Sequence, residues 1–243
     1  MNTNDHAQWT AVDQYFGEML IPSDPVLEAA LNASTAAGLP DINVAPNQGK
    51  FLMLLVQTLQ ARTILEIGTL GGYSTIWLTR GLAADVLAEA DHLPYKPVIT
   101  LEIDPKHAEV ARANLARAGF AAVVDVQLGR AVDSLAPLIA AVANGSRPAF
   151  DFIFIDADKP SNPAYFEAAL KLAHPGTLIF IDNVVRRGMV SDPTSTDPNV
   201  TGVRQLNEQI KAASGVTATT IQTVGSKGYD GFTLVRVNPA ADR

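Results

Sequence analysis

The chain has 243 residues, enough for one large α/β domain with a sizeable core and short for two full domains. Hydrophobic residues make up 47% and charged residues 18%, which is typical of globular proteins and excludes a largely disordered chain. The net charge of −7 argues against a nucleic-acid partner, because binding to the phosphate backbone depends on clustered Lys and Arg.

The first 60 residues are predicted to be helical. Helical patterns cover residues 9–20, 25–37 and 48–60, all ahead of the first predicted strand. We interpret residues 1–60 as an N-terminal helical cap on an α/β core at residues 61–243. The whole chain, 1–243, is expected to form a single domain.

From about residue 63 onward, short apolar or β-branched runs alternate with helical stretches, the pattern of parallel strands joined by crossover helices. Strands are predicted at residues 63–67, 98–103, 123–128, 150–155 and 177–181. Helices are predicted at residues 73–82, 105–118, 131–142 and 163–173. The strands are almost continuously apolar, as in sheets that helices cover on both faces.

The end of the chain changes character. After a predicted helix at residues 200–213, strands at 216–223 and 232–237 are separated by a short glycine-rich turn and are predicted to pair antiparallel. The expected fold is therefore α/β and Rossmann-like: a doubly wound, mostly parallel seven-stranded sheet with an antiparallel C-terminal pair. Residues 83–97 exceed a normal link and are interpreted as a surface excursion.

No feature of the sequence predicts export or membrane insertion. The first residues, MNTNDH, lack the basic and apolar parts of a signal peptide, and every apolar run is far shorter than the roughly 20 residues that span a bilayer. The chain has no cysteine, so any metal would be held by oxygen or histidine. We expect a soluble, cytoplasmic protein without a membrane partner.

A glycine-rich turn follows the first predicted strand. Residues 66–74 read EIGTLGGYS, in which Gly68, Gly71 and Gly72 let the backbone turn tightly and approach a ligand. The spacing is not the G-x-G-x-x-G of NAD-binding turns, and the Glu66 carboxylate suits a ligand ammonium better than a pyrophosphate. A tight turn without a ligand is the alternative interpretation.

Two more strand ends suggest a nucleotide site, because ligands of open parallel sheets bind beyond the carboxyl ends of the strands. Glu102 follows the second strand, where an acidic residue accepts the hydroxyls of a ribose, a feature shared with NAD enzymes. Gly129 and Ala131 follow the third strand and offer small residues against which an adenine could lie.

Carboxylates follow the fourth and fifth strands. Strand four leads into Asp156, Asp158 and Lys159, and strand five leads into Asp182 and Asn183. If these strands are adjacent, two carboxylates and an amide form an oxygen-rich half shell suited to a hard cation such as Mg²⁺. Helix capping by the Asp residues and a surface role for the lysine are the alternatives.

These segments together resemble the cation-dependent O-methyltransferases of the catechol and caffeoyl-CoA type, within the class I S-adenosylmethionine fold. The resemblance spans nearly the whole chain. It is carried by residues 43–44, 48–49, 66–74, 101–104, 155–159, 181–184 and 230–231.

The resemblance implies a role for each candidate residue. Asp156, Asp182 and Asn183 would hold a divalent cation, Mg²⁺ first with Mn²⁺ or Ca²⁺ as alternatives, and Lys159 would be the catalytic base. The cofactor S-adenosylmethionine would be bound by Val44, Glu66, Gly68, Gly72, Tyr73, Ser74, Glu102, Gly129, Ala131, Asp156 and Asp158. A homodimer is expected by resemblance to bacterial relatives.

The chain departs from the family around the acceptor. Asn162 stands where the family often has Tyr, whereas Tyr165 keeps the second aromatic position. Residues 184–188 lack a frequent Trp and contain Arg186 and Arg187, which either meet an anionic acceptor or form a solvated pair. The sequence does not define the acceptor.

The predicted function is metal-dependent O-methyl transfer from S-adenosylmethionine to a hydroxyl of a small catechol-like or caffeoyl-type acceptor, a hydroxylated aromatic compound. The cation would activate the hydroxyl, Lys159 would take its proton, and the oxygen would attack the sulfonium methyl. The alternatives are a metal-independent small-molecule methyltransferase, an NAD-dependent oxidoreductase and a nonenzymatic binding protein on the same fold.

Overall fold

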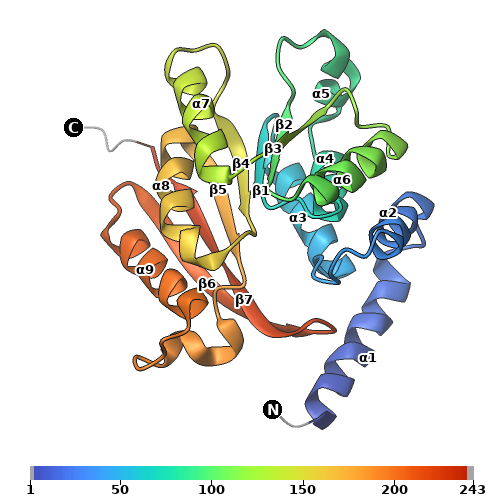
Figure 1. The fold of residues 1–243 in the computed structure, drawn as a ribbon, viewed down its shortest axis with the longest axis vertical. Helices are drawn as coiled ribbons and strands as arrows, with labels where there is room; N and C mark the ends of the chain where they lie inside the picture. Colours follow the sequence, from blue (N-terminus) through green and yellow to red (C-terminus); the bar gives the residue numbers. More distant parts are fainter. Residues whose placement is uncertain (1–2, 240–243) are drawn as a thin grey trace. The chain divides into compact units, whose positions relative to one another are not determined.

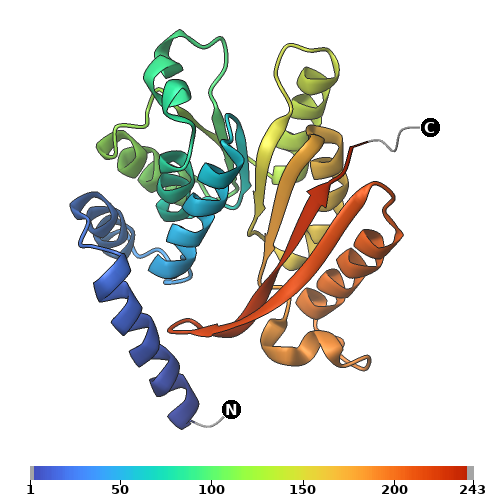
Figure 2. The same ribbon diagram turned by 180° about the vertical axis from the view of Figure 1, so that it is seen from behind.

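The computed structural model describes residues 3–239, which form two compact units (Figures 1 and 2). Unit one comprises residues 3–130 together with 225–228, and unit two comprises residues 131–224 together with 229–239. Each unit has its own strands and its own covering helices. In the described part of the chain, no helix is long and apolar enough to cross a membrane.

Unit one contains six α-helices and one short 3-10 helix within the described residues. They are α1 (Thr3–Leu20), α2 (Pro25–Ala36), α3 (Pro46–Leu59), α4 (Tyr73–Arg80), α5 (Ala84–Glu89), η1 (Ala90–His92) and α6 (Pro105–Arg117). The three predicted N-terminal helices are confirmed. The surface excursion at residues 83–97 was incompletely predicted, because it contains α5 and η1, which bury Val86 and Ala90.

The three strands of unit one are parallel. They are β1 (Ile64–Ile67), β2 (Val98–Glu102) and β3 (Val124–Leu128), in the order β3-β2-β1. Ile64 pairs with Val98, which in turn pairs with Val124. All residues of β1 and β2 are buried, as their continuous apolar character predicted, and the polar Glu66, Thr100 and Glu102 are therefore buried with them.

Unit two holds the remaining elements. They are α7 (Ala131–Ala143), β4 (Phe150–Ile155), η2 (Lys159–Ser161), α8 (Asn162–Leu172), β5 (Ala173–Asp182), η3 (Arg186–Ser191), α9 (Pro198–Ala212), β6 (Val216–Gly225) and β7 (Gly228–Val237). The two 3-10 helices were not predicted. Strand β5 begins at Ala173, four residues earlier than predicted, so the His-Pro-Gly run at 174–176 lies within the strand.

The strands of unit two have the order β4-β5-β7-β6. Strand β4 is parallel to β5, and β5 is antiparallel to β7. Strands β6 and β7 are hydrogen-bonded neighbours joined by a short turn, so the predicted antiparallel C-terminal pair is confirmed. The core of this unit is aromatic. Phe154 and Phe180 meet edge to face, and Phe180 stacks on Phe232 at 4.5 Å between ring centroids.

Three helices begin with the same dipeptide. Asp24-Pro25 starts α2, Asp104-Pro105 starts α6, and Asp197-Pro198 starts α9. In each case the Asp side chain accepts a hydrogen bond from a backbone N–H of the first turn. The proline has a helical φ, and its missing N–H costs no hydrogen bond because the first N–H groups of a helix have no acceptor within the helix. These pairs fix where the three helices start.

The turn between β6 and β7 belongs to unit one. Backbone N of Ser226 donates to Oδ2 of Asp13 on α1 at 2.7 Å, and Lys227 forms an ion pair with Asp41 at 2.6 Å. A Cβ atom on Gly225 would lie 2.6 Å from the same Asp13 oxygen, so glycine permits this approach. Both strands are longer than predicted because they extend to this turn.

Candidate active site

The glycine-rich turn after β1 depends on left-handed backbone conformations. Gly68 has a φ of +101° and Gly72 a φ of +81°, values that residues with a Cβ atom rarely adopt. Leu70 between them also has a positive φ, +51°. The turn is closed by hydrogen bonds from Gly68 N to Leu101 O and from Gly72 N to Thr69 O. Both glycines are therefore required by the backbone.

Glu66 is completely buried at the end of β1, and hydroxyl groups surround its carboxylate. Oε1 accepts a hydrogen bond from Ser74 Oγ at 2.6 Å, and Oε2 accepts from Thr75 Oγ1 at 2.5 Å and Thr100 Oγ1 at 2.6 Å. The structure thus brings together two predicted cofactor residues, Glu66 and Ser74. Thr75 and Thr100 were missed, although the β1–β2 register, which pairs Glu66 with Thr100, would have indicated one of them.

Glu102 connects two strand ends through backbone amides. Its Oε1 accepts from the N–H groups of Ile103 and Asp104, both at 2.9 Å, and its Oε2 accepts from those of Thr69 at 3.2 Å and Leu70 at 2.7 Å. A carboxylate offers about four lone-pair positions, and these four donors occupy them. A ribose held by Glu102 would therefore have to share or exchange some of these bonds.

The other predicted cofactor residues of unit one differ in how far they are exposed to solvent. Val44 and Tyr73 are buried, and burial, reinforced by the charge of Asp24, raises the pKa of the Tyr73 hydroxyl. Gly129 is half-buried, and its N–H donates to Glu102 O at 2.8 Å. In unit two, the predicted Ala131 is the first residue of α7.

The predicted metal ligands of unit two follow neighbouring strands. Ile155 at the end of β4 pairs in parallel register with Ile181 of β5, so the next residues, Asp156 and Asp182, lie at the same edge. This confirms the adjacency that the prediction required. Asn183 has a left-handed φ of +55°, which Asn tolerates, and its N–H donates to Asp182 Oδ1 at 2.8 Å.

The chemistry of this set fits a hard cation. Between residues 3 and 239, no group of three or more His, Cys, Asp or Glu side chains is placed to hold a metal. The predicted set contains two carboxylates, Asp156 and Asp182, and the amide of Asn183, so all its donors are oxygens. Such a partial shell is typical of Mg²⁺, which keeps several positions for water or substrate.

Lys159 is buried, with only 7% of its side chain exposed. Its Nζ donates to Asp156 Oδ1 at 3.0 Å, so the nitrogen has a carboxylate partner inside the protein. The residue begins η2, the short turn that follows β4. The structure therefore brings the predicted base into contact with a predicted metal ligand.

Asp158 is exposed, but its carboxylate accepts a hydrogen bond from Tyr165 of α8. Burial raises the pKa of its carboxyl group, but hydrogen bonds from Ser161 and Tyr165 lower it more, so the pKa lies below the ordinary value. The Tyr165 hydroxyl donates to Asp158 Oδ1 at 2.5 Å. This contact attaches the residues after β4 to helix α8, and it gives Tyr165 a structural role.

Arg186 and Arg187 behave differently from each other. Both have left-handed φ values, +54° and +55°. The half-buried Arg186 donates its backbone N–H to Asp230 Oδ1 at 3.0 Å, and its guanidinium forms an ion pair with the same carboxylate at 3.7 Å. Arg187 is exposed. Asp230 thus has a defined role in fixing the turn that begins at Val185.

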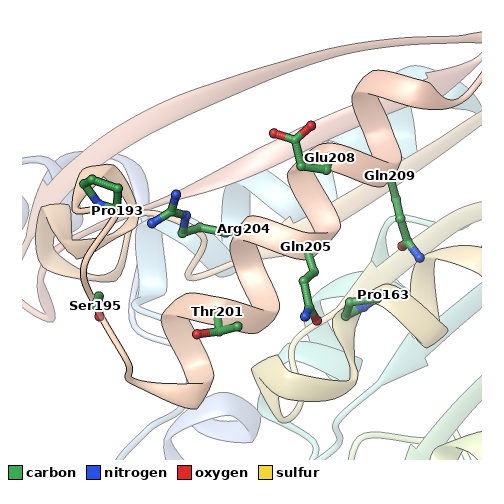
Figure 3. A pocket seen from close by; sticks show the side chains of 8 residues that line it. All are labelled: Pro163, Pro193, Ser195, Thr201, Arg204, Gln205, Glu208 and Gln209. Atoms are coloured by element: carbon green, nitrogen blue, oxygen red, sulfur yellow. The ribbon is translucent and has the colours of Figure 1, made fainter.

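A hollow of about 560 Å³ lies on α9, and none of the predicted site residues lines it (Figure 3). Its walls come from α9, the segment before α9 and the start of α8: Pro163, Pro193, Ser195, Thr201, Arg204, Gln205, Glu208 and Gln209. Figure 3 shows Arg204 extending from α9 toward Pro193. Most of these side chains are polar, and none belongs to the predicted cofactor or metal set.

Known proteins are similar in sequence to this chain over nearly its whole length. The model of the O-methyltransferase family matches residues 21–238. A catechol O-methyltransferase of Niastella koreensis is 49% identical over 227 residues, 93% of this chain and 96% of that protein. A catechol O-methyltransferase of Mycobacterium tuberculosis is 48% identical over 226 residues, 93% of this chain and 94% of that protein.

A solved structure agrees with these relatives. The O-methyltransferase of Bacillus cereus in complex with SAH matches with a TM-score of 0.87 and 54% identity, covering 96% of this chain and 100% of that one. The predicted Rossmann-like, mostly parallel α/β fold is therefore confirmed. The oxidoreductase alternative is set aside. The chain belongs to the O-methyltransferase family and is an enzyme that takes its methyl group from S-adenosylmethionine.

Proposed function

We propose that the enzyme methylates a hydroxyl of a small catechol-like acceptor in a reaction that depends on a divalent cation, and that its two units make up one methyltransferase domain. The observation that carries the proposal is the neighbouring position of Asp156 and Asp182 after paired strands, with Lys159 hydrogen-bonded to Asp156. Carboxylates and a buried lysine at one sheet edge suit proton removal beside a cation.

Each residue of unit two has a distinct part in this reaction. Asp156, Asp182 and Asn183 would hold the cation. When bound, Mg²⁺ would stabilise the ionised form of the acceptor hydroxyl and fix the acceptor in position. As the neutral amine, Lys159 accepts the hydroxyl proton at Nζ and becomes the ammonium, and Asp156 orients that nitrogen through their hydrogen bond.

The residues of unit one serve the methyl donor. We assign the amino-acid part of S-adenosylmethionine to the region of Glu66 and Ser74 and the ribose to Glu102. The acceptor oxygen forms a bond to the methyl carbon, the carbon–sulfur bond breaks, and the electron pair stays on sulfur in S-adenosylhomocysteine. The positive charge of the sulfonium is cancelled in this step, so a site with net negative charge favours donor over product.

The catechol class is favoured over other acceptors by the names of the two relatives at 48–49% identity. Two adjacent oxygens of a catechol also suit a cation with open coordination positions. A caffeoyl-type ester is the alternative within the same reaction. Arg186 is paired with Asp230, whereas the exposed Arg187 forms no ion pair with any residue between 3 and 239 and is therefore the one of the two better suited to an anionic acceptor.

The test is methyl transfer from labelled S-adenosylmethionine to catechol, caffeic acid and caffeoyl-CoA, each with Mg²⁺, Mn²⁺ or Ca²⁺ and each with a chelator. We expect transfer to a catechol that the chelator abolishes and added cation restores. Transfer that persists in chelator would show the metal-independent alternative. The same protein in analytical ultracentrifugation tests the expected homodimer, which a monomer mass would contradict.

A further inference from the structure

Helix α9 approaches the turn that carries Lys159 without any side chain between them. A Cβ atom added at Gly202 would lie 2.3 Å from the carbonyl oxygen of Lys159 and 2.7 Å from Cα of Pro160. Non-bonded carbon atoms do not come so close. The backbone of α9 at Gly202 therefore lies in direct contact with the backbone of η2.

The backbone conformation of α9 does not explain this glycine. Gly202 is in the second turn of the helix and has no left-handed φ, so an L-residue could adopt its conformation. Glycine is disfavoured inside helices because it loses more conformational freedom than other residues. The other inward positions, Val200, Val203 and Leu206, carry large apolar side chains. The close approach to η2 is what accounts for Gly202.

The position of α9 is fixed by contacts that do not involve Lys159. Asp197 caps its first turn, and the N–H of Thr201 donates to Asp197 O at 2.9 Å. Arg204 NH1 donates to the carbonyl oxygen of Asp192 at 2.7 Å and so attaches the helix to the preceding segment. A larger residue at 202 would therefore displace η2 at least as much as α9.

We propose that Gly202 is a positioning residue for Lys159. Because Gly202 has no side chain, η2 packs directly against the backbone of α9, and this contact determines where the lysine nitrogen lies relative to Asp156. The proposal rests on the assignment of Lys159 as the base. The Tyr165 hydroxyl of α8 donates a hydrogen bond to Asp158, the residue before η2. Helices α8 and α9 thus both contact this turn. The Nζ atom of Lys159, which the turn carries, forms the 3.0 Å hydrogen bond to Asp156.

The test compares Gly202→Ala with Gly17→Ala. Gly17 also lies inside a helix without a left-handed φ, but nothing lies within 4 Å of an added Cβ atom there. For Gly202→Ala we expect kcat to fall by at least about tenfold, since small misplacements of reacting groups are costly, with KM for S-adenosylmethionine within about twofold of wild type. Amide hydrogen exchange should accelerate in residues 158–162. Gly17→Ala should change none of these quantities.

A folded Gly202→Ala enzyme with wild-type kcat and unchanged exchange overturns the proposal. Lys159→Ala, measured in parallel, separates the base role of Lys159 from the positioning role of Gly202. Full turnover by Lys159→Ala refutes the base role. Amide exchange at residues 158–162 in Gly202→Ala still reports on the contact between α9 and η2. If Gly202→Ala does not fold, Arg204→Ala decides the question, because it loosens α9 without adding an atom. Faster exchange at 158–162 in Arg204→Ala supports the proposal, and unchanged exchange overturns it.

Discussion

The Nζ atom of Lys159 lies 3.0 Å from Oδ1 of Asp156, and the lysine side chain is almost fully buried. In a partly buried pair of this kind, removal of Asp156 would leave the lysine nitrogen without its carboxylate partner away from water. A cation held by Asp156 would share that carboxylate group with the lysine. The proposed base and the proposed metal ligand are therefore expected to respond to each other's substitution.

Asp156→Ala should remove metal stimulation together with almost all activity. The variant loses a carboxylate of the proposed cation shell and the partner of Lys159, so we expect kcat to fall by about 100-fold or more. Initial rates over a range of Mg²⁺ concentrations measure this. The matched control is Asp192→Asn, whose carboxylate accepts two hydrogen bonds from nearby Thr194. An Asp156→Ala enzyme that is fully active and still stimulated by Mg²⁺ would refute the metal assignment.

Lys159→Ala should slow turnover and leave the cofactor affinity nearly unchanged. Loss of a general base typically lowers the rate by about 10²- to 10⁴-fold. Isothermal titration with S-adenosylmethionine, alongside kcat for the catechol acceptor, separates the two effects. Lys171→Ala, which removes an exposed lysine paired with Glu167, is the control. A collapse of cofactor binding in Lys159→Ala would mean that the lysine is structural.

The sequence predicted the strands and the residues at their carboxyl ends well, because buried parallel strands are marked by continuous apolar runs and the chemistry follows directly after them. It could not predict partners that depend on register or on distant packing. Thr100 donates to Glu66 only because the two residues are paired across β1 and β2. Gly202 meets η2 only because α9 packs there, and no local pattern marks that contact.

The sequence predicted a long surface segment at residues 83–97 before β2, but it did not predict helix α5 within that segment. Residues 84–89 carry a single deeply buried apolar side chain, Val86, so the helical periodicity is too weak to recognise. The four backbone donors on Glu102 were also beyond prediction. They arise from the turn after β1 and from the residues that follow Glu102 itself, which meet only in the folded chain.

Thr100→Val should destabilise the folded protein through the Glu66 carboxylate. Valine keeps the shape of threonine and its preference for strands, but it removes one of the hydroxyl donors around a fully buried charge. We expect a loss of about 1–3 kcal/mol in the free energy of unfolding. Urea denaturation followed by circular dichroism measures it. Thr100→Ser keeps the hydroxyl and should lose clearly less, so equal losses for the two variants would refute the role of the hydrogen bond.

The ion pair between Asp24 and Arg80 should give a defined pH dependence to the stability of unit one. Arg80 donates to the Asp24 carboxylate at 2.6 Å and 3.2 Å, and the hydrogen bond from Arg80 is the main reason that the pKa of Asp24 lies below its ordinary value, 3.8. Because the pKa is lowered in the folded state, the stabilisation is fully present above that ordinary value. It is lost as the pH falls through the lower, folded value.

The variant Asp24→Asn isolates this effect, since asparagine still caps α2 but carries no charge. We expect wild type to be more stable than the variant by about 1 kcal/mol at pH 6–7, because the pair is partly exposed and screened by solvent. The difference should shrink below about pH 4 as Asp24 takes up a proton in the folded state. Urea unfolding of both proteins from pH 3 to pH 7 tests this. A difference that stays constant over that range would show that the asparagine changes the cap and that the ion pair contributes little.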